Sequence, residues 1–592
     1  ILNNNQLANS DFLTGAFPAE YGNATSGVFD LKMRNGNNEK NEFLGQVGFN
    51  GFELGAEGPI SKKNGSSYLV NYRYSTLEFF DLLGVDFGTG TAIPKYQDGS
   101  FKINLPRTKA GSFSVFGVGG KSDISFLESE QDTTDKALDF YSGEGFDLIN
   151  GSDLAVLGAS HTYFYNSTTY SKFTISGMYH NFHTEMDSIV PETYEILPYF
   201  GNSHKEYKLF GSFFLNKKIN SRHTLKGGLT FSWMQYDFVD SVYNDDFNRF
   251  DVITEFDGNT TLIQPFVEWQ FKINNDLTLN SGVHYQLFTL NDSYNIEPRL
   301  GLQWAFKSNQ TLSFGYGYHS QMAPVTVYFN QTRLPDGSYY QPNQDLDMTH
   351  SQHFVLGYDW YINSSLRLKA ETYYQDITNA GVDGHASNSY SILNQGANFY
   401  VWTPDTLVNS GTGKNYGLEF TLEKFLNKGL YYLVTASLYE SKYKGSDGVE
   451  RNTAFNGNYV FNGLIGKEWN LTRDPEKRKN KQFTLLVDIK TTLAGGQRYT
   501  PVKVIQTGPN SYVADYQQEQ AYSKQFDDYF RTDFRIALRQ NNKKTSMEWA
   551  IDVQNLFDTQ NIYGQSFNSK TGETDYTYQL GLLVIPQFKI IF

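Results

Sequence analysis

The chain has 592 residues, of which 49 are basic and 63 acidic, so its net charge is −14, and it contains no cysteine. The acidic balance argues against a nucleic-acid partner, and a chain without cysteine forms neither disulfides nor thiolate metal sites. Aromatic residues make up 16% of the chain, yet the mean hydropathy is −0.49 and every apolar run is far too short for a membrane-spanning helix.

The first forty residues differ in composition from the rest of the chain. Residues 15–38 are rich in glycine and asparagine, and only residues 27–33 are predicted to form a short strand. A segment of this size is too small to bury a core of its own. We therefore interpret residues 1–40 as the end of a larger unit, followed by a first long strand near residues 43–49.

From residue 41 onward, many windows alternate between apolar and polar residues. In one of them, Phe530 and Phe534 fall on one face of a strand, and Arg531, Asp533 and Arg535 fall on the other. Buried charges need partners, so we expect these three to form ion pairs with neighbouring strands or with a plug. Strands with one apolar and one charged face are typical of a transmembrane barrel, whose charged face lines a wet lumen.

Short polar connections rich in Asn, Lys, Ser and Gly separate these windows, as hairpin turns require. Irregular stretches, often of roughly 15 to 35 residues, are expected between successive turns. Ten short turns, with both chain ends on one side, require eleven long loops and 22 strands. The prediction is an all-β, 22-stranded antiparallel transmembrane β-barrel with short periplasmic turns and long extracellular loops. The ten turns are placed at residues 60–66, 105–111, 166–169, 217–223, 273–277, 306–311, 362–366, 425–430, 473–482 and 540–546.

The alternation continues to the last residue of the chain. Phe588, Ile590 and Phe592 fall on one face of a predicted strand, and Lys589 falls on the other. Chain ends usually fray, but a strand that closes a membrane barrel cannot, because lipid tolerates no open sheet edge. This pattern predicts a multi-pass protein of the bacterial outer membrane.

Several motifs resemble those of one family, the TonB-dependent outer-membrane receptors. Residues 17–32 (FPAEYGNATSGVFDLK) resemble the last strand of the family's plug domain, and residues 552–558 (DVQNLFD) resemble the motif of its penultimate strand. The resemblance covers essentially the whole chain and divides it into the C-terminal remnant of a plug, residues 1–40, and a barrel, residues 41–592. Motifs similar to those of Bacteroidetes members lie at residues 297–301 (EPRLG), 373–376 (YYQD), 495–501 (GGQRYTP) and 529–533 (YFRTD).

The resemblance implies active import of a bulky nutrient, such as an oligosaccharide, a siderophore or a peptide, without enzymatic chemistry and without a cofactor. The partner protein TonB would pull on a segment upstream of residue 1. The alternative is a plugless or plug-reduced barrel that acts as a structural subunit or pore of a larger outer-membrane complex. A passive porin is a third interpretation, and the plug-like strand argues against it.

The same resemblance implies further partners besides outer-membrane lipid. Phe588, Ile590 and Phe592 are similar to the signal that the barrel-assembly machinery reads during biogenesis. A surface lipoprotein could cover the loops as a lid, or other outer-membrane subunits could bind there.

Aromatic residues in the predicted loops are the candidate ligand contacts. Aromatic faces stack on sugar rings and on hydrophobic chelates, and Asn388, Asn394 and Asn398 could donate hydrogen bonds nearby. Aromatic side chains also form interface girdles and pack loops together, so both interpretations stay open. The candidates are Tyr328, Tyr339, Tyr340, Tyr390, Phe399, Tyr400 and Trp402.

Two patterns suggest cation sites, and a simpler interpretation is preferred for each. Residues 121–153 hold nine carboxylates against two lysines in one predicted surface loop. They could attract cations, but their spacing fits no compact calcium loop, and a solvated acidic loop is the simpler interpretation. His350 and His353 point to opposite faces of a strand, so we predict no shared metal ion. No grouping of a nucleophile, a base and an orienting residue stands out either.

Overall fold

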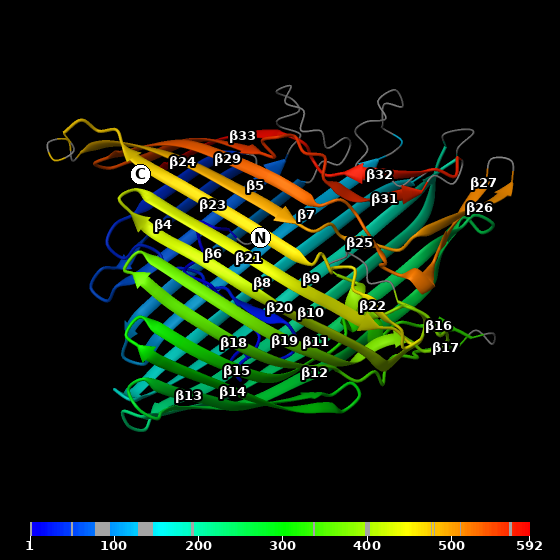
Figure 1. Ribbon diagram of the computed structural model, residues 1–592, viewed down its shortest axis with the longest axis horizontal. Coiled ribbons are helices and arrows are strands. Elements are labelled where there is room, and N and C mark those ends of the chain that lie inside the picture. Colours follow the sequence, from blue (N-terminus) through cyan, green and yellow to red (C-terminus); the bar gives the residue numbers. More distant parts are fainter. Residues whose placement is uncertain are drawn as a thin grey trace.

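A computed structural model of the chain shows a barrel that encloses the N-terminal segment (Figure 1). The structure describes residues 3–48, 51–76, 95–127, 129, 146–190, 195–334, 338–396, 403–474, 476, 478, 480–508, 511–567 and 571–592. Within them, 22 antiparallel wall strands close into one barrel, as the count of turns predicted. No helix in the described part of the chain is long and apolar enough to cross a membrane.

Each wall strand pairs with the next along the chain. The wall strands are β3 (Glu42–Gly48), β4 (Gly51–Ser61), β5 (Ser66–Thr76), β6 (Lys95–Thr108), β7 (Gly111–Leu127), β8 (Phe146–Asn166), β9 (Thr169–Ile189), β10 (Ile196–Lys218), β11 (His223–Asn244), β12 (Arg249–Lys272), β13 (Leu277–Phe288), β14 (Ser293–Lys307), β15 (Gln310–Gln321), β18 (Thr349–Asn363), β19 (Leu366–Asp383), β20 (Leu407–Asn427), β21 (Leu430–Lys444), β23 (Tyr459–Asn470), β24 (Lys481–Ala494), β29 (Tyr529–Asn542), β30 (Ser546–Gln554) and β33 (Leu583–Ile591).

Shorter elements lie in the N-terminal segment and in the connections. They are β1 (Asp11–Thr14), β2 (Gly27–Asp30), α2 (Val325–Tyr328), β16 (Thr332–Arg333), β17 (Tyr339–Tyr340), η2 (Ile392–Asn394), β22 (Glu450–Asn452), β25 (Arg498–Tyr499), β26 (Val502–Gly508), β27 (Ser511–Tyr516), η3 (Gln518–Gln520), β28 (Lys524–Gln525), β31 (Ile562–Phe567) and β32 (Thr574–Tyr578).

The last strand closes the barrel by pairing with both β30 and the first wall strand, β3. In the register with β3, Val47 lies opposite Phe588. Beyond β33, Phe43 and Phe592 exchange two backbone hydrogen bonds of 2.9 and 3.0 Å. The side chain of Lys589 points into the lumen. The predicted closing role of the terminal strand is therefore confirmed.

All ten predicted short turns join consecutive strands, and they lie together at the left end of the barrel in Figure 1. The predicted long irregular loops are partly wrong, because strands β8 to β12 run for 21 to 24 residues each. At about 3.3 Å per residue, these strands extend about 70 to 80 Å, far beyond an apolar band of about 25 Å. Backbone pairing continues after these strands leave the lipid, and only four residues join β11 to β12.

The two faces of the wall differ as the alternation predicted. Large apolar side chains such as Leu54 and Leu157 are exposed on the outer face, where lipid would cover them. On the lumenal face, Arg535 forms ion pairs with Asp552 at 2.7 Å and with Glu548 at 2.9 Å. The expected pairing with a neighbouring strand is confirmed for Arg535, whereas Arg531 and Asp533 form an ion pair with each other, at 2.6 Å, on their own strand.

The N-terminal segment lies inside the barrel, where it appears in dark blue behind the front strands of Figure 1. Its only paired strands are β1 and β2, which form a two-stranded sheet with Asp11 opposite Asp30 and Thr14 opposite Gly27 among the described residues. The predicted strand at residues 27–33 is therefore shorter than expected and ends at Asp30. A segment with so little pairing of its own depends on the wall for its position.

Candidate functional site

The wall near the chain's closure holds both ends of the N-terminal segment. Asn3 donates hydrogen bonds of 2.9 Å to Glu53 and to Asn71, which point inward from β4 and β5. Arg34 binds Glu57 through two bonds of 2.7 Å each. Charge-assisted pairs of this fork-like geometry fix orientation as well as position. The segment therefore starts and ends against the same few strands and spans the lumen between them.

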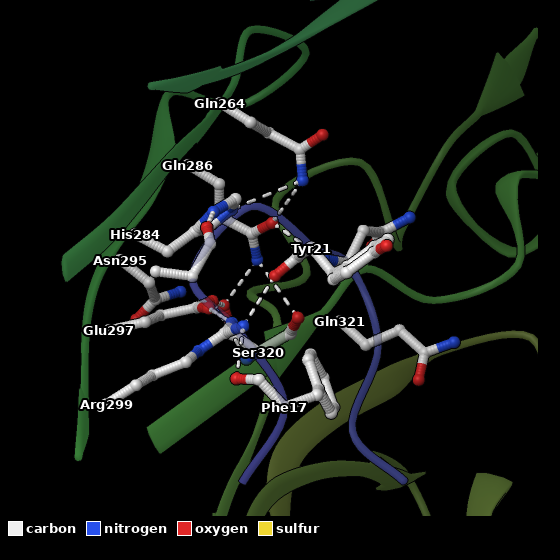
Figure 2. Close-up of polar contacts among 12 residues, drawn as sticks. Phe17, Tyr21, Gln264, His284, Gln286, Asn295, Glu297, Arg299, Ser320 and Gln321 are labelled. Carbon is white, nitrogen blue, oxygen red and sulfur yellow. Dashed lines mark hydrogen bonds and ion pairs between the residues drawn. The ribbon is translucent and has the colours of Figure 1, made fainter. Parts of the chain in front are cut away.

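Across the lumen, residues 15–25 contact strands β11 to β19, and we call them the seated segment (Figure 2). Arg299 Nη1 on β14 donates to the carbonyl oxygens of Phe17 at 3.3 Å, Pro18 at 2.6 Å and Tyr21 at 2.6 Å. Its Nη2 donates to Glu297 Oε2 at 2.5 Å. One guanidinium thus connects a wall carboxylate to three backbone carbonyls of one loop. The arrangement holds the backbone of the seated segment, whatever its side chains.

Glu297 and Arg299 share a face because they lie two residues apart on one strand. The side chain of Glu297 is 0% exposed and that of Arg299 is 4% exposed. Glu297 Oε1 also accepts from the Ser320 backbone N–H at 2.9 Å and from its hydroxyl at 2.6 Å. A buried charge is stable only with such a full set of partners. Removing either member would leave the other unpaired in a closed space.

Two histidines extend this grip along the seated segment. His284 donates from Nδ1 to the Ala19 carbonyl at 2.8 Å, and His353 donates from Nε2 to the Thr25 carbonyl at 2.6 Å. The backbone at Gly22 passes so close to His284 that an added Cβ would lie 2.1 Å from its Nε2. The histidine predicted not to bind metal, His353, thus binds backbone. Among the described residues, no group of three or more His, Asp or Glu side chains could hold a metal ion.

Small residues on the wall allow the seated segment to approach closely. A Cβ built on Gly282 would lie 2.8 Å from the Cβ of Ala19, and one built on Gly315 would lie 3.1 Å from the Cβ of Ala16. The first distance is shorter than real Cβ contacts, so even alanine at position 282 would force a shift. The fit is therefore steric as well as polar.

Charged side chains and a cavity lie beside the seated segment, and we call the wall residues that contact this segment the seat. Glu20 forms an ion pair with Lys226 of β11, and its backbone N–H donates to Glu268 of β12 at 3.0 Å. A cavity of about 400 Å³ between the segment and strands β10 to β14 is lined in part by Lys226, Glu268 and Arg299. Polar atoms next to such a cavity can exchange their partners for water. The seat is tight at its backbone contacts and loosely packed around them.

A second segment also enters the lumen, the connection between β15 and β18. We call residues 322–348 the inward loop, and every statement about it concerns its described residues, 322–334 and 338–348. It carries α2, and Val327, Tyr328 and Phe329 are 2%, 0% and 2% exposed. Phe329 stacks on Phe256 of β12 at 3.6 Å, and Tyr328 packs on Phe288 of β13 at 5.1 Å. The inward loop also contributes Leu346 and Met348 to this apolar cluster. The wall contributes Met234, Tyr236, Phe238, Leu262, Phe288 and Leu407.

The burial of its apolar side chains in this cluster strongly stabilises the position of the inward loop. Burial of a side chain such as leucine or phenylalanine contributes about 2 kcal/mol, so the five buried residues Val327, Tyr328, Phe329, Leu346 and Met348 contribute on the order of 10 kcal/mol. Burial also raises the pKa of Tyr328 to about 12, and its hydroxyl accepts from the Ala323 backbone at 3.1 Å. The inward loop is anchored as a protein core is, by the exclusion of water.

The inward loop touches the seated segment directly. The Met322 backbone N–H donates to Asn23 Oδ1 at 2.9 Å, and the Asn23 backbone N–H donates to Gln286 Oε1 at 3.1 Å. Asn23 adopts a left-handed φ of 53°, a conformation that asparagine tolerates better than most residues. Gln286 in turn donates to the Ser320 carbonyl at 3.1 Å. These contacts join both segments inside the barrel.

The predicted ligand-contacting aromatic residues take different places. Tyr328 has no exposed surface, and Tyr390 is half-buried against the apolar cluster. Tyr339 and Tyr340 are 46% and 55% exposed on β17, at the outer end of the inward loop. Phe399, Tyr400 and Trp402 lie outside the described residues. Ligand contact stays a prediction, and in this structure only Tyr339 and Tyr340 among the described candidates present open aromatic faces.

The predicted acidic loop needs revision, whereas ligand contact by the three asparagines stays a prediction. Asn388 donates to Asp383 Oδ2 at 2.6 Å, so it stabilises its own loop. Residues 121–153 are not one loop, because β7 continues to Leu127 and β8 begins at Phe146, which puts Asp123 and Asp153 in strands. The rest of the acidic stretch lies almost entirely outside the described residues. Here, as in β8 to β12, strand pairing continues into residues that were expected to form a loop.

The sequence did not reveal Arg299, His284, Gln286 or Asn23 as contacts. Arg299 lies in the motif at residues 297–301, which was noted for its resemblance and not for what it binds. A signal was present, since two opposite charges two residues apart on a strand share one face and need a third partner. The identity of that partner was not encoded nearby, because Tyr21 lies 278 residues away.

Comparisons with known proteins agree with this architecture. Residues 95–556 match the family model described as TonB dependent receptor-like, beta-barrel. The ferric-catecholate import receptor Fiu of E. coli K12 has a TM-score of 0.69 at 12% identity, covering 98% of this chain and 85% of that one. FpvA of Pseudomonas aeruginosa PAO1, bound to pyoverdine, has a TM-score of 0.69 at 14% identity, and the match covers 98% of this chain and 83% of that one. The copper transporter OprC has a TM-score of 0.66 at 12% identity, and the match covers 98% of this chain and 85% of that one.

No curated protein sequence matches the chain. Identities of 12 to 14% to solved structures show the fold alone. The family model carries more weight, because it covers well over half of the chain. The predicted outer-membrane location and the non-enzymatic role are confirmed by this match, whereas the Bacteroidetes affinity stays a prediction. The chain is a multi-pass outer-membrane protein that belongs to the TonB-dependent receptor-like β-barrel family, whose members act in TonB-dependent import.

Proposed function

We propose that the protein imports a bulky nutrient, such as an oligosaccharide, a siderophore or a peptide, and that residues 1–40 are the last part of its plug. The observation that carries the proposal is the grip of Arg299 on the carbonyls of Phe17, Pro18 and Tyr21. A wall residue that holds a loop by its backbone keeps an obstacle inside the pore. Such an obstacle suits a gated importer and not an open porin.

The chemistry of the seat suits a gate that opens and closes. Its contacts are hydrogen bonds and ion pairs beside a cavity of about 400 Å³, from which water can replace partners that separate, and the net contribution of one bond is about 1 kcal/mol. A pull from TonB on a segment upstream of residue 1 would break a few such bonds in succession. Glu297 would keep its bond to Arg299 meanwhile, so the guanidinium would stay in place to donate again to the returning carbonyls.

The nutrient class follows less directly. The solved relatives include a ferric-catecholate import receptor, a pyoverdine receptor and a copper transporter, which supports a chelate as one candidate. The exposed rings of Tyr339 and Tyr340 support any ligand with flat apolar faces, sugars included. Both observations are compatible with a ligand too large for free diffusion.

A second candidate is a plug-reduced barrel that serves as a subunit or pore of a larger outer-membrane complex. Exposed apolar side chains on the hairpins β26–β27 and β31–β32, among them Ile505, Val513 and Tyr563, favour a protein partner. A surface lipoprotein over the loops is one such partner, and the barrel-assembly machinery is a transient one. This candidate and the importer differ in whether transport consumes energy.

An uptake assay separates the two candidates. Cells with and without the full-length protein are given four labelled probes: ferric enterobactin, cyanocobalamin, maltoheptaose and a decapeptide, each with and without a proton uncoupler. The proposal expects at least one probe to accumulate only with the protein and only in energised cells. Accumulation that ignores the uncoupler would identify a pore. Failure of all four, with stable co-purifying outer-membrane partners, would favour the structural role.

A further inference from the structure

We propose that the inward loop, residues 322–348, is a fixed partition in the barrel mouth that selects by size what reaches the seated segment, and not a lid that swings open. Selection among nutrients rests on the proposed import function, but the fixed position of the loop does not. Loops at the mouth of a gated pore are natural candidates for a moving lid. Three sets of contacts argue against that role here.

The first set is the apolar anchor. Val327, Tyr328 and Phe329 are consecutive and all buried. The end of α2 and the residue after it therefore pack against the lumenal faces of β11 to β13. A lid that swings out would expose this whole cluster to water at each opening. Ligand-driven movements use weakly packed elements, because a ligand shifts an equilibrium only by its differential affinity. The inward loop is instead tightly packed, because it has an apolar core of its own.

The second set consists of amide clamps to the neighbouring connections. Asn343, which is buried, accepts from the Leu407 backbone N–H at 2.7 Å and donates to the Asp405 carbonyl at 3.2 Å. On the other side, Asn291 donates to the Leu346 carbonyl at 2.8 Å. The inward loop is thus tied to the β13–β14 connection and to the β19–β20 connection at once. Movement would require both flanking connections to move with it.

The third set ties the partition to the gate. The bond from Met322 to Asn23 places the start of the inward loop directly on the seated segment. Thr25 also donates from its hydroxyl to Gln321 Oε1 at 2.9 Å, just before the loop begins. The outer end of the loop, with Tyr339 and Tyr340, is exposed instead. The loop therefore occupies part of the route from the outside to the seat, with an aromatic outer end and an immobile inner end.

Size-graded labelling tests the partition without any ligand. The chain has no cysteine, so a single introduced cysteine is the only thiol. Ser26, which follows the seated segment and is exposed, is replaced in Ser26→Cys, and intact cells are treated with a small impermeant maleimide or with one carrying a polyethylene-glycol chain. Tyr340→Cys at the outer end is the reference. The proposal expects the small reagent to label both sites, and the large one to label Ser26→Cys at least about tenfold more slowly than Tyr340→Cys.

A matched pair of variants assigns this barrier to the inward loop. Val327→Asp puts a charge into the apolar cluster, and Thr326→Asp puts the same charge on the neighbouring residue outside it. In the Ser26→Cys background, Val327→Asp should raise the rate of labelling by the large reagent about tenfold, whereas Thr326→Asp should not change it. Equal labelling of Ser26→Cys and Tyr340→Cys by the large reagent in the unaltered loop would overturn the proposal.

A buried cysteine tests whether the loop opens during transport. Val327→Cys changes the volume little, and heat-modifiable migration on a gel checks that the barrel has assembled. The proposal expects Val327→Cys to stay unlabelled by the small reagent while Tyr340→Cys is labelled to completion, also in energised cells that are importing a probe. If import occurs and Val327→Cys becomes labelled during it, the loop is a lid and the partition is refuted, while the import function stands. If no probe is imported and Val327→Cys stays protected, the import function fails and the partition stands.

Discussion

Two segments fill the lumen, and a different kind of contact predominates in each. The seated segment, residues 15–25, is held by hydrogen bonds from Arg299, His284 and His353 to its backbone carbonyls. The inward loop is held by buried apolar side chains. Water can replace each polar contact as it breaks, but nothing in the lumen replaces an apolar core. The difference indicates which segment can move, since a gate needs the first kind of contact and a fixed wall needs the second.

The largest expected effect comes from the apolar side of this comparison. Phe329→Ala would remove a ring stacked on Phe256 and leave a cavity, which costs about 4 kcal/mol. Hydrogen exchange of residues 322–348 should become faster by two to three orders of magnitude, while exchange of the seated segment should change much less. If hydrogen exchange became equally faster in both segments, they would open as one unit, and the distinction between a fixed loop and a movable segment would be wrong.

The next effect concerns the polar seat. Arg299→Met would remove three bonds to the seated segment and leave Glu297 buried without its cation, at a cost of about 3 kcal/mol. Protease cleavage within residues 15–25 should become measurable in the folded barrel. Adding Glu297→Gln should recover part of the loss by removing the unpaired charge. Equal loss in the single and the double variant would mean that Arg299 acts through the seated segment alone.

Steric fit predicts a smaller effect with a close control. Gly282→Ala would push a methyl group against Ala19 and should cost about 1 to 2 kcal/mol at the seat. Gly177→Ala adds the same group to a wall strand where no atom lies within 4 Å, so it should be silent. Cleavage of the seated segment by protease compares the two. A seat that tolerates both substitutions equally is not as tightly fitted as the structure shows.

The smallest effect is expected at the entrance. Tyr340→Ala would remove an exposed aromatic face, and we expect a loss of ligand affinity of about tenfold or less, because one such face contributes about 1 kcal/mol. Tyr328→Phe, at a buried ring, should leave affinity unchanged. Binding of the imported probe to purified protein provides the measurement. An unchanged affinity for Tyr340→Ala would remove this residue from the ligand site.

The wall of this barrel could be predicted from sequence because alternation is a local signal. The ten turns and the terminal strand ending at Phe592 follow from residues that lie next to one another in the chain. The ends of β8 to β12 were missed because strand pairing continued into polar sequence that had no clear alternation. Polar composition predicts exposure to water, and an extended wall above the membrane meets that condition as well as a loop does.

The contents of the lumen could not be predicted in the same way. The contact between Arg299 and Tyr21 joins residues 278 positions apart, and nothing local specifies the pair. Tyr328 was expected to meet a ligand because it is aromatic and lies in a connection. The neighbouring Val327 and Phe329 show why it does not, since three consecutive large apolar residues in a connection indicate a loop with a core of its own.

The central claim is that the seated segment is a gate that must leave its place during import. Ala16→Cys with Gly315→Cys tests it most directly, because the two Cβ positions are 3.1 Å apart and a disulfide needs about 3.5 to 4.5 Å, a small adjustment. Energised cells would be given the probe that the unaltered protein imports, with the pair oxidised and then reduced. We predict no import through the oxidised form and recovery on reduction. Equal import through both forms would show that the segment stays seated, and it would contradict the account.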